Sequence, residues 1–292
     1  MRRTSHKSPF AGIITRMLML LSAFLLLLSY ASMVVNPAKA WYMTILGLLF
    51  VPIAVLNGLF LIMAIKNRSS SFMIPLLALL PSIIFIGRYF QFSSGAEERT
   101  EDTVKILTYN VGHFALGREA EFKGDGGQAA CADSVMNFVR RSGADIVCLQ
   151  EVNLPGEYDV AKYFRKRLPD YHLGYFMFLT DRGSYGNVTL SKFPIVNKGR
   201  LTFDKSSNLA IFTDFKIGEG NVMRVYNCHF ESYNISISRL KKSVREQDGD
   251  MMWATEEKMK KSIRRRPEQV DKVMSDIEGC TLESIVTGDF ND

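Results

Sequence analysis

Long uncharged apolar runs in the first third of the chain place the strongest constraint on its fold. Residues 17–35 contain no charge over 19 residues, and residues 41–65 contain none over 25. Residues 72–92 contain a single charge, Arg88, near their end. A helix of about 20 apolar residues crosses the roughly 30 Å hydrocarbon core of a bilayer. We therefore expect residues 1–95 to form a membrane anchor with three transmembrane helices, at about 17–35, 41–65 and 72–92.

Basic residues around these runs predict their orientation. They concentrate before the first run and between the second and third, at Arg2, Arg3, Lys7, Arg16, Lys66 and Arg68. The loop between the first two runs has only Lys39, so the amino terminus should be cytoplasmic. Three spans then place residues 96–292 on the extracytoplasmic side, as in a bacterial inner-membrane protein. A cleaved signal peptide is the alternative for the first run, but that run is long for one and two more follow it.

Neither the net charge nor the cysteines identify a site by themselves. Much of the net charge of +6 lies in residues 239–266, where Asp and Glu residues interrupt the basic ones. We favour a solvent-exposed helix face for this segment; a surface for phosphate-bearing substrates or anionic lipid is the alternative. The four cysteines show no zinc-ligand spacing and are typical of small buried residues rather than a disulfide framework.

Residues 96–292 have the pattern of one soluble domain of alternating strands and helices. We expect strands at 104–109, 146–149, 175–179, 186–191, 210–215, 222–228 and 284–286. We expect helices at 129–142, 157–168 and 267–277, with Pro267 in the first turn of the last one. The middle strands follow one another without helices between them, which favours a mixed sheet over a parallel one. The domain is therefore predicted to be a layered α/β fold.

Polar residues stand at the carboxyl ends of four of these strands. Asn110 follows the first strand, Glu151 the second and His229 the one before the last, while Asp289 and Asn291 follow the last. Open α/β sheets collect their sites at such ends. Carboxylate and carboxamide oxygens suit a hard divalent cation, which can polarise a phosphoryl oxygen while a carboxylate activates water. The pattern predicts a metal-assisted phosphoester chemistry.

Five segments in this order resemble the endonuclease/exonuclease/phosphatase superfamily, which includes deoxyribonucleases, abasic-site endonucleases, neutral sphingomyelinases and inositol polyphosphate phosphatases. The segments are Leu-Thr-Tyr-Asn-Val at 107–111, Leu-Gln-Glu-Val at 149–152, Tyr-Gly-Asn-Val-Thr-Leu-Ser-Lys-Phe-Pro-Ile at 185–195, Asn-Cys-His-Phe at 227–230 and Gly-Asp-Phe-Asn at 288–291. The resemblance covers residue 104 onward and none of the apolar part. It implies a four-layer α/β/β/α sandwich of two mixed β-sheets. It also implies a Mg²⁺-dependent hydrolase of phosphodiesters or phosphomonoesters, with Mn²⁺ as a possible substitute.

The same resemblance implies roles for individual residues. Glu151 would be the principal metal ligand, with Asn110 beside it. Asp289 would orient or deprotonate the attacking water, and Asn291 would position the phosphate or the nucleophile. His229 would donate a hydrogen bond to a phosphate oxygen.

Substrate contacts are the least defined part of the resemblance. Asn187 matches a position near the phosphate in some members of the superfamily, and His229 would also contact the substrate. Nucleic acid, lipid head groups and sugar phosphates are all substrates of such sites, and the fold does not choose among them. No protein partner is implied.

The chain departs from the superfamily at its end. Members continue past Gly-Asp-x-Asn to further strands and a terminal Ser-Asp-His motif, which this sequence lacks, so we expect a truncated version of a longer protein. Neither His113 nor His172 replaces that histidine on motif grounds, although His113 follows the strand of Asn110. A catalytically inactive phosphate-binding or sensor module is therefore the alternative function.

Overall fold

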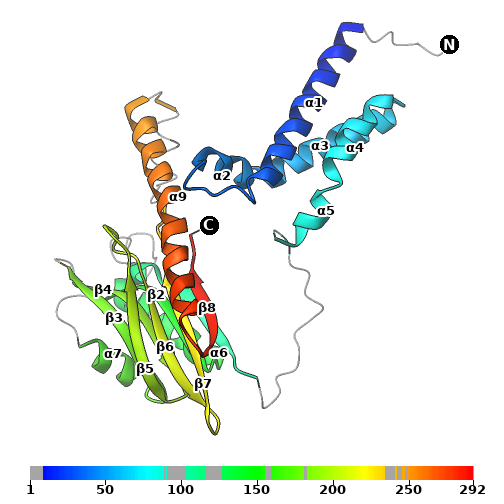
Figure 1. Cartoon of the computed structure of the whole chain (residues 1–292). Helices are drawn as coiled ribbons and strands as arrows, with labels where there is room; N and C mark the ends of the chain where they lie inside the picture. Colours follow the sequence, from blue (N-terminus) through cyan, green and yellow to red (C-terminus); the bar gives the residue numbers. More distant parts are fainter. Residues whose placement is uncertain are drawn as a thin grey trace. The chain divides into compact units, whose positions relative to one another are not determined.

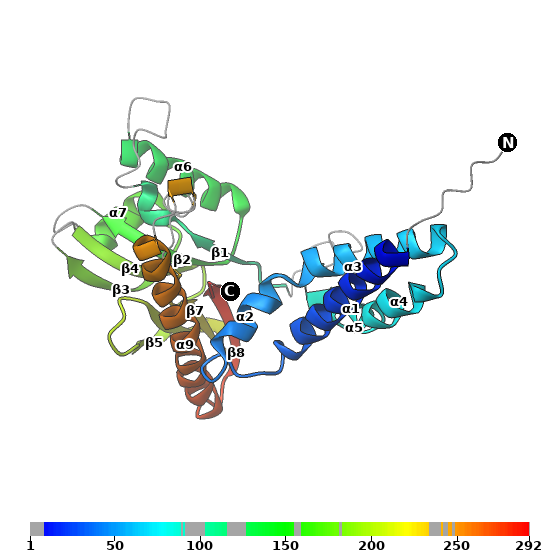
Figure 2. The same ribbon diagram turned by 90° about the horizontal axis from the view of Figure 1, so that it is seen from above.

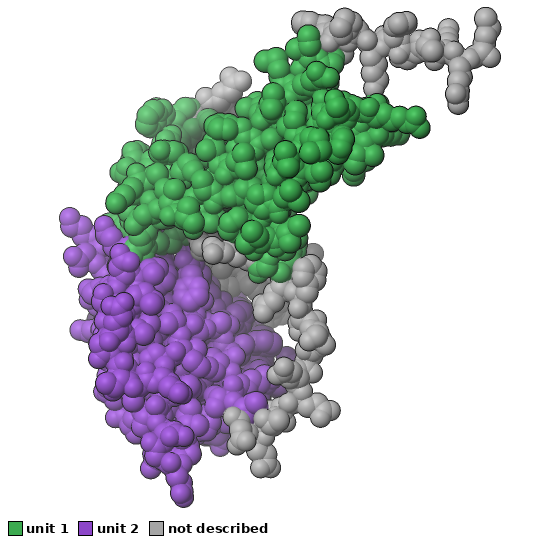
Figure 3. Space-filling model, turned by 45° about the vertical axis from the view of Figure 1, so that its right-hand side comes forward, with its two compact units in different colours: residues 1–98, 237–267 green, residues 99–236, 268–292 purple. Residues whose placement is uncertain are grey.

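A computed structural model of the chain describes residues 9–88, 90, 103–115, 127–154, 159–180, 183–233, 241, 245–246 and 249–291 (Figure 1). The chain divides into two compact units, coloured separately in Figure 3. The first, here the helical unit, comprises Met1–Glu98 and Ile237–Pro267. The second, here the sandwich unit, comprises Arg99–Ser236 and Glu268–Asp292.

Only the first of the three apolar segments of the helical unit forms one long unbroken helix, and the other two are divided into shorter helices. Its elements are α1 (Pro9–Ala31), α2 (Trp41–Leu48), α3 (Phe50–Lys66), η1 (Ser70–Phe72), α4 (Met73–Leu79), α5 (Ser82–Phe85) and η2 (Ile86–Arg88). Of the described residues, only Gly12–Ala31 form an unbroken helix that is long and apolar enough to cross a membrane. The expected span at 41–65 is α2 and α3, which meet at 52°. The expected span at 72–92 corresponds to a shorter apolar stretch, Ser70–Phe85. Residues 89, 91 and 92 of the expected span lie outside the described part of the chain.

Buried polar side chains join the helices of this unit. Asn57 of α3 is fully buried, and its Nδ2 donates to the Oγ and the carbonyl oxygen of Ser22 in α1 at 2.8 and 3.1 Å. The Tyr30 hydroxyl of α1 donates to the Ala78 carbonyl oxygen at 2.8 Å and lies 2.6 Å from the Ser82 hydroxyl. Hydrogen bonds of this kind are the usual link between apolar helices that pack on one another.

Two four-stranded mixed sheets make up the sandwich unit (Figures 1 and 2). Sheet A has the order β1-β2-β4-β3, and sheet B has the order β5-β6-β7-β8. Within each sheet one pair is parallel, β1 with β2 and β7 with β8, and the other pairs are antiparallel. The strands are β1 (Ile106–Asn110), β2 (Ile146–Leu154), β3 (His172–Thr180), β4 (Gly183–Ser191), β5 (Ile195–Thr202), β6 (Leu209–Ile217), β7 (Asn221–His229) and β8 (Glu283–Asp289).

Helices flank the two sheets on their outer faces. A buried apolar cluster joins α6 (Gly127–Ser142) and α7 (Val160–Arg167) to sheet A, and another joins the second half of α9 (Gly249–Glu278) to sheet B. A third cluster lies between the sheets, where Ile146 and Cys148 of β2 meet Phe215 and Val225. The predicted α/β/β/α sandwich is thereby confirmed.

Three local expectations are wrong. β5 follows the Lys-Phe-Pro turn directly and was not among the expected strands. β2 runs on to Leu154 instead of ending at residue 149, so Glu151 lies inside it. Pro267 lies within α9, which begins at Gly249, and not in a first turn, because the packing of a long helix outweighs the cost of one missing N–H donor.

Candidate active site

The two parallel strand pairs bring four of the predicted residues to one place. Asn110 ends β1, His229 ends β7 and Asp289 ends β8, with His229 and Asp289 directly opposite each other in the β7–β8 ladder. Glu151 comes from β2, the neighbour of β1 in sheet A. One ligand atom each from Glu151, His229 and Asp289 lies within 4.8 Å of the other two.

A β-bulge aims the Glu151 side chain into this cluster. The β2–β4 ladder shifts register between Leu149 and Val152, and Glu151 itself has a positive φ of 53°. A bulge redirects side chains away from the simple alternation of a strand. As a result Gln150 is buried while the side chain of Glu151 stays 22% exposed and faces the cluster.

Asn110 holds the two carboxylates together. Its Oδ1 accepts a hydrogen bond from the Gly112 N–H at 2.9 Å, which fixes the orientation of the carboxamide. Its Nδ2 then donates to Glu151 Oε1 at 3.0 Å and to Asp289 Oδ2 at 2.6 Å. The like charges of these carboxylates repel at such range, so an Asn donor between them stabilises the arrangement.

His229 is the most buried member of the cluster. Its side chain is 4% exposed, and its Nε2 lies 3.4 Å from Glu151 Oε1 without a hydrogen-bond partner among the described residues. Burial lowers the pKa of His229 below its ordinary value, and the charges of Glu151 and Asp289 oppose that shift. The imidazole is therefore neutral at pH 7.

Tyr185 and His113 complete one side of the cluster. The Tyr185 hydroxyl lies 3.4 Å from His229 Nδ1, and its ring stacks on the His113 ring with centroids 5.1 Å apart. His113 Nε2 lies 3.2 Å from Glu151 Oε2. Burial, then the charges of Glu151 and Asp289, raise the pKa of Tyr185 above its ordinary value of 10, so the phenol keeps its proton and can donate it in a hydrogen bond.

A glycine lets the last strand approach closely enough to place Asp289. Gly288 has a φ of 140°, and a Cβ built there would lie 1.9 Å from the Cys228 carbonyl oxygen. Asn291 follows with its N–H donating to Asp289 Oδ1 at 3.0 Å and its Nδ2 donating to the Phe230 carbonyl oxygen at 2.8 Å. Asn291 thus braces the Asp289 turn, and its predicted contact with phosphate or nucleophile stays a prediction.

Asn187 belongs to a buried polar network between the sheets. It is fully buried, and its Nδ2 donates to the carbonyl oxygens of Leu209 and Asn227 at 3.3 and 3.2 Å. The Asn227 side chain in turn accepts from Gln150 Nε2 at 2.7 Å. This network supports the bulge at Glu151, and a substrate contact of Asn187 stays a prediction.

The donor set fits a divalent cation. Two carboxylates and an imidazole converge, and the buried His229 Nε2 has an unused lone pair or proton facing Glu151. Carboxylate oxygens suit Mg²⁺ and Mn²⁺, and an imidazole nitrogen is more typical of Mn²⁺ than of Mg²⁺. Glu151, Asp289 and His229 are the residues that would hold such an ion.

Two residues of the cluster were not assigned to it from the sequence. Tyr185 lies two residues before Asn187 on β4, so the period of a strand places both on one face. That spacing was a usable signal. The sequence does not place His113 in the cluster, because His113 and Phe114 both have a positive φ, 58° and 51°, in a turn that no motif predicts. His172 starts β3 and is not part of the cluster.

The fold is a two-sheet sandwich, and its acidic and imidazole groups gather where the parallel strands end. This combination places the domain among layered α/β proteins with a site at the strand ends. The sequence profile of the endonuclease/exonuclease/phosphatase family matches residues 107–292, more than half of the chain. The chain belongs to this family, whose members are hydrolases that act on phosphoester bonds. Residues 12–89 match a second profile, a domain of unknown function (DUF8431). No curated protein matches the chain.

Solved structures of low similarity also match. Truncated TDP2 of Caenorhabditis elegans is 18% identical over 67% of this chain and 65% of that chain, with a TM-score of 0.41. An endonuclease/exonuclease/phosphatase from Beutenbergia cavernae is 14% identical over 64% and 47%, with a TM-score of 0.42. The 3′ phosphatase NExo from Neisseria, bound to a product DNA hairpin, is 15% identical over 65% and 58%, with a TM-score of 0.39. This chain thus spans less than two thirds of each, and at these scores they carry no argument.

Proposed function

We propose that this chain is a divalent-metal-dependent phosphoester hydrolase. The observation that carries the proposal is the convergence of Glu151, His229 and Asp289 within 4.8 Å, with Asn110 bonded to both carboxylates. Family membership supports the reaction class. A bound divalent ion would polarise a phosphoryl oxygen and stabilise the charge that develops on it.

The residues of the chain supply the rest of the chemistry. Asp289 Oδ1 accepts a hydrogen bond from the Asn291 N–H, and its Oδ2 accepts one from Asn110 Nδ2. These bonds fix the carboxylate in an orientation in which it can accept a proton from water. Tyr185 is protonated at pH 7, so its hydroxyl can donate a hydrogen bond to a phosphate oxygen without a full charge of its own. His229 is neutral at that pH, which leaves a nitrogen lone pair for the ion. Asn110 keeps the two carboxylates in register when substrate is absent.

We further propose that α1 tethers the enzyme to a membrane. Gly12–Ala31 has the length and the composition of a spanning helix. The bent pair of α2 and α3 would add a second, broken span. The predictions of three spans, a cytoplasmic amino terminus and an extracytoplasmic catalytic domain depend on how these helices meet the bilayer, which protease accessibility in sealed vesicles would measure.

The hydrolase proposal is tested with the full chain in a neutral detergent and a chromogenic phosphodiester and phosphomonoester. Hydrolysis should require Mg²⁺ or Mn²⁺ and stop with EDTA. Glu151→Gln keeps the size of the side chain and removes its charge, and should lower turnover by about 100-fold or more. Glu219→Gln, in the exposed turn between β6 and β7, is the matched control and should leave turnover unchanged.

Two results would contradict this proposal. One is equal hydrolysis with and without EDTA. The other is equal turnover in Glu151→Gln and Glu219→Gln. Binding of phosphate esters by the wild type, with no hydrolysis under any metal, would instead favour the non-catalytic phosphate-binding module.

A further inference from the structure

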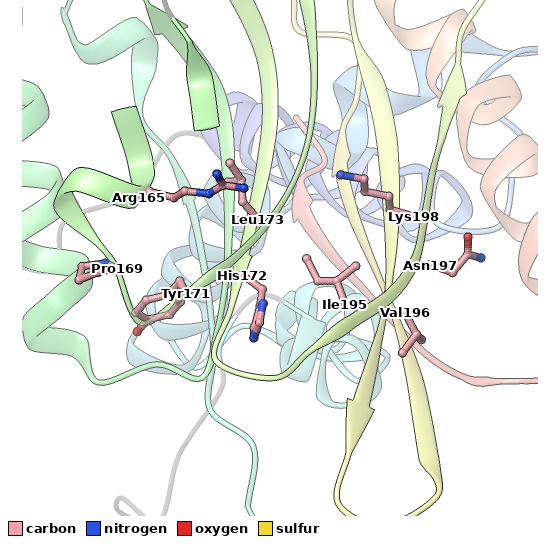
Figure 4. Close-up of a pocket in the computed structure, with 9 residues that line it drawn as sticks. All are labelled: Arg165, Pro169, Tyr171, His172, Leu173, Ile195, Val196, Asn197 and Lys198. Atoms are coloured by element: carbon pink, nitrogen blue, oxygen red, sulfur yellow. The ribbon is translucent and has the colours of Figure 1, made fainter. Parts of the chain in front are cut away.

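The side of the sandwich formed by β3 and β5 carries a groove that the metal cluster does not use. These two strands are the edge strands of sheets A and B, and they contact each other. A cavity of about 500 Å³ opens between the start of β3, the start of β5 and the end of α7. Its lining residues are Arg165, Pro169, Tyr171, His172, Leu173, Ile195, Val196, Asn197 and Lys198 (Figure 4).

A second cavity continues the groove along β5. It has a volume of about 270 Å³, shares Lys198 with the first, and adds Tyr175, Phe176 and Arg200. Gly199 lies between Lys198 and Arg200, and the Phe212 ring packs closely over it, since a Cβ there would lie 2.3 Å from that ring. Because both cavities are lined by Lys198, they are neighbours along β5.

The charged side chains that line the two cavities are all basic. Arg165, Lys198 and Arg200 line it, and none of the three has an ion-pair partner among the described residues. No Asp or Glu of the described part lines either cavity. In Figure 4 the Arg165 guanidinium and the Lys198 ammonium extend from opposite sides toward the same space.

Strand geometry directs two of these cations inward. Lys198 and Arg200 are opposite Thr213 and Ile211 of β6, both of which are buried on the face between the sheets. Lys198 and Arg200 therefore point toward β3, about 7 Å apart along the strand. The Lys198 Nζ lies 5.7 Å from the centroid of the Tyr175 ring, and the Arg200 Cζ lies 3.9 Å from that of Phe176.

We propose that this groove binds the backbone of a single-stranded nucleic acid. A groove lined by cations beside aromatic rings is the arrangement that tracks a phosphodiester chain while bases stack on the rings. Tyr175 is 39% exposed and offers a face for one base. A groove between two strand edges admits one extended strand, whereas a lipid bilayer needs a flat basic face.

Protection of the sheet edges is the competing explanation. Charged residues on edge strands prevent pairing with other chains, and Lys198 and Arg200 would serve that purpose on β5. Edge protection requires neither the Arg165 of a separate helix nor an exposed ring, and it predicts no ligand. The two explanations therefore differ in a binding measurement.

The test is fluorescence anisotropy of a labelled single-stranded oligonucleotide with the full chain in neutral detergent. EDTA and the Glu151→Gln background prevent turnover, so the result does not depend on the proposed hydrolysis. The wild-type groove should bind with an affinity that falls linearly on a log–log plot against salt. Changing Arg165, Lys198 and Arg200 to alanine should weaken binding about ten-fold or more and make that slope shallower by about 2.

Further variants separate the groove from overall charge and from misfolding. Arg141→Ala removes an exposed cation at the end of α6 and should leave the affinity and the slope unchanged. Tyr175→Leu should weaken binding at least about five-fold through the lost base stacking. If the triple variant does not fold, Arg200→Gln alone should reduce the slope by about 0.7. A wild type that does not bind, or groove variants that bind as the wild type does, would overturn the proposal.

Discussion

Gly288→Ala tests whether the close approach of β8 to β7 places the carboxylate of Asp289, for which we propose a catalytic role. The alanine Cβ would stand 1.9 Å from the Cys228 carbonyl oxygen, whereas carbon–oxygen contacts between strands settle at about 3.3 Å. The parallel ladder pairs Cys228 with Gly288 and His229 with Asp289. The strands must therefore separate by roughly 1 Å at the position next to Asp289.

The size of the effect follows from this displacement. Asp289 Oδ2 accepts a hydrogen bond from Asn110 Nδ2 at 2.6 Å, and a shift of about 1 Å breaks that hydrogen bond. A misplacement of about 1 Å at a reacting group costs roughly 100-fold in rate. The positive φ of 140° at Gly288 adds a conformational cost of about 1–3 kcal/mol to folding.

The measurement pairs hydrolysis of the chromogenic diester with thermal unfolding. Gly218→Ala is the matched control, because Gly218 also has a positive φ of 65° but has open space where the Cβ would be. The control should lose about 1 kcal/mol of stability and keep full turnover. Gly288→Ala should lose turnover by about 100-fold while a folded fraction remains.

Equal turnover in Gly288→Ala and the wild type would refute this reasoning. It would mean that β8 can move without displacing Asp289, or that Asp289 takes no part in the reaction. Equal losses of turnover in both glycine variants would show that strain in sheet B, and not the contact with Cys228, controls the rate.

Three further predictions follow from other contacts. Glu151→Gln should abolish the binding of Mn²⁺ measured by calorimetry. The melting temperature without metal should stay the same or rise, because one of two neighbouring like charges is gone. An unchanged Mn²⁺ affinity would exclude Glu151 as a ligand. Burial raises the pKa of Cys148 and Cys228 to about 12, so both thiols stay protonated between pH 7 and 9. Alkylation followed by mass spectrometry should therefore modify only the two half-buried cysteines until the protein unfolds. Modification of Cys148 in folded protein would contradict this. Asn57→Leu removes the hydrogen bonds to Ser22 and should destabilise the helical unit by about 0.6 kcal/mol, measured by unfolding in detergent against Ser22→Ala, which should give a similar loss.

The sequence predicts the position of a site residue where that residue stands at the end of a strand. Asn110, His229 and Asp289 each end a strand, and an apolar run that stops at a polar residue marks such an end. The pairing of β1 with β2 and of β7 with β8 then brings these ends together. The structure alone shows that pairing, because apolar periodicity does not say which strands are neighbours.

The apolar segments of the helical unit show where composition stops being informative. An apolar run of 25 residues is compatible with one straight helix, yet α2 and α3 meet at Leu49 at an angle of 52°. The contacts that arrange the neighbouring helices are specific side-chain hydrogen bonds: α3 bonds to α1 through Asn57, and α1 bonds to α4 through Tyr30. Neither contact has a signature in hydropathy.

The orientation of the Glu151 side chain depends on backbone strain at Glu151 that cannot be read from the sequence. A non-glycine residue in the left-handed region costs about 1–2 kcal/mol, and its φ of 53° exposes the carboxylate that alternation would otherwise place elsewhere. Gln150 offsets that cost: its Nε2 donates to Asn227 Oδ1 at 2.7 Å and to Thr108 Oγ1 at 3.1 Å, and each buried hydrogen bond contributes about 1 kcal/mol. Gln150→Leu should therefore relax the bulge and lower metal affinity without touching the metal, because the partner that holds the neighbouring residue inward is lost. A Gln150→Leu variant with wild-type Mn²⁺ affinity would show that the bulge is held by the Asn110 hydrogen bonds alone.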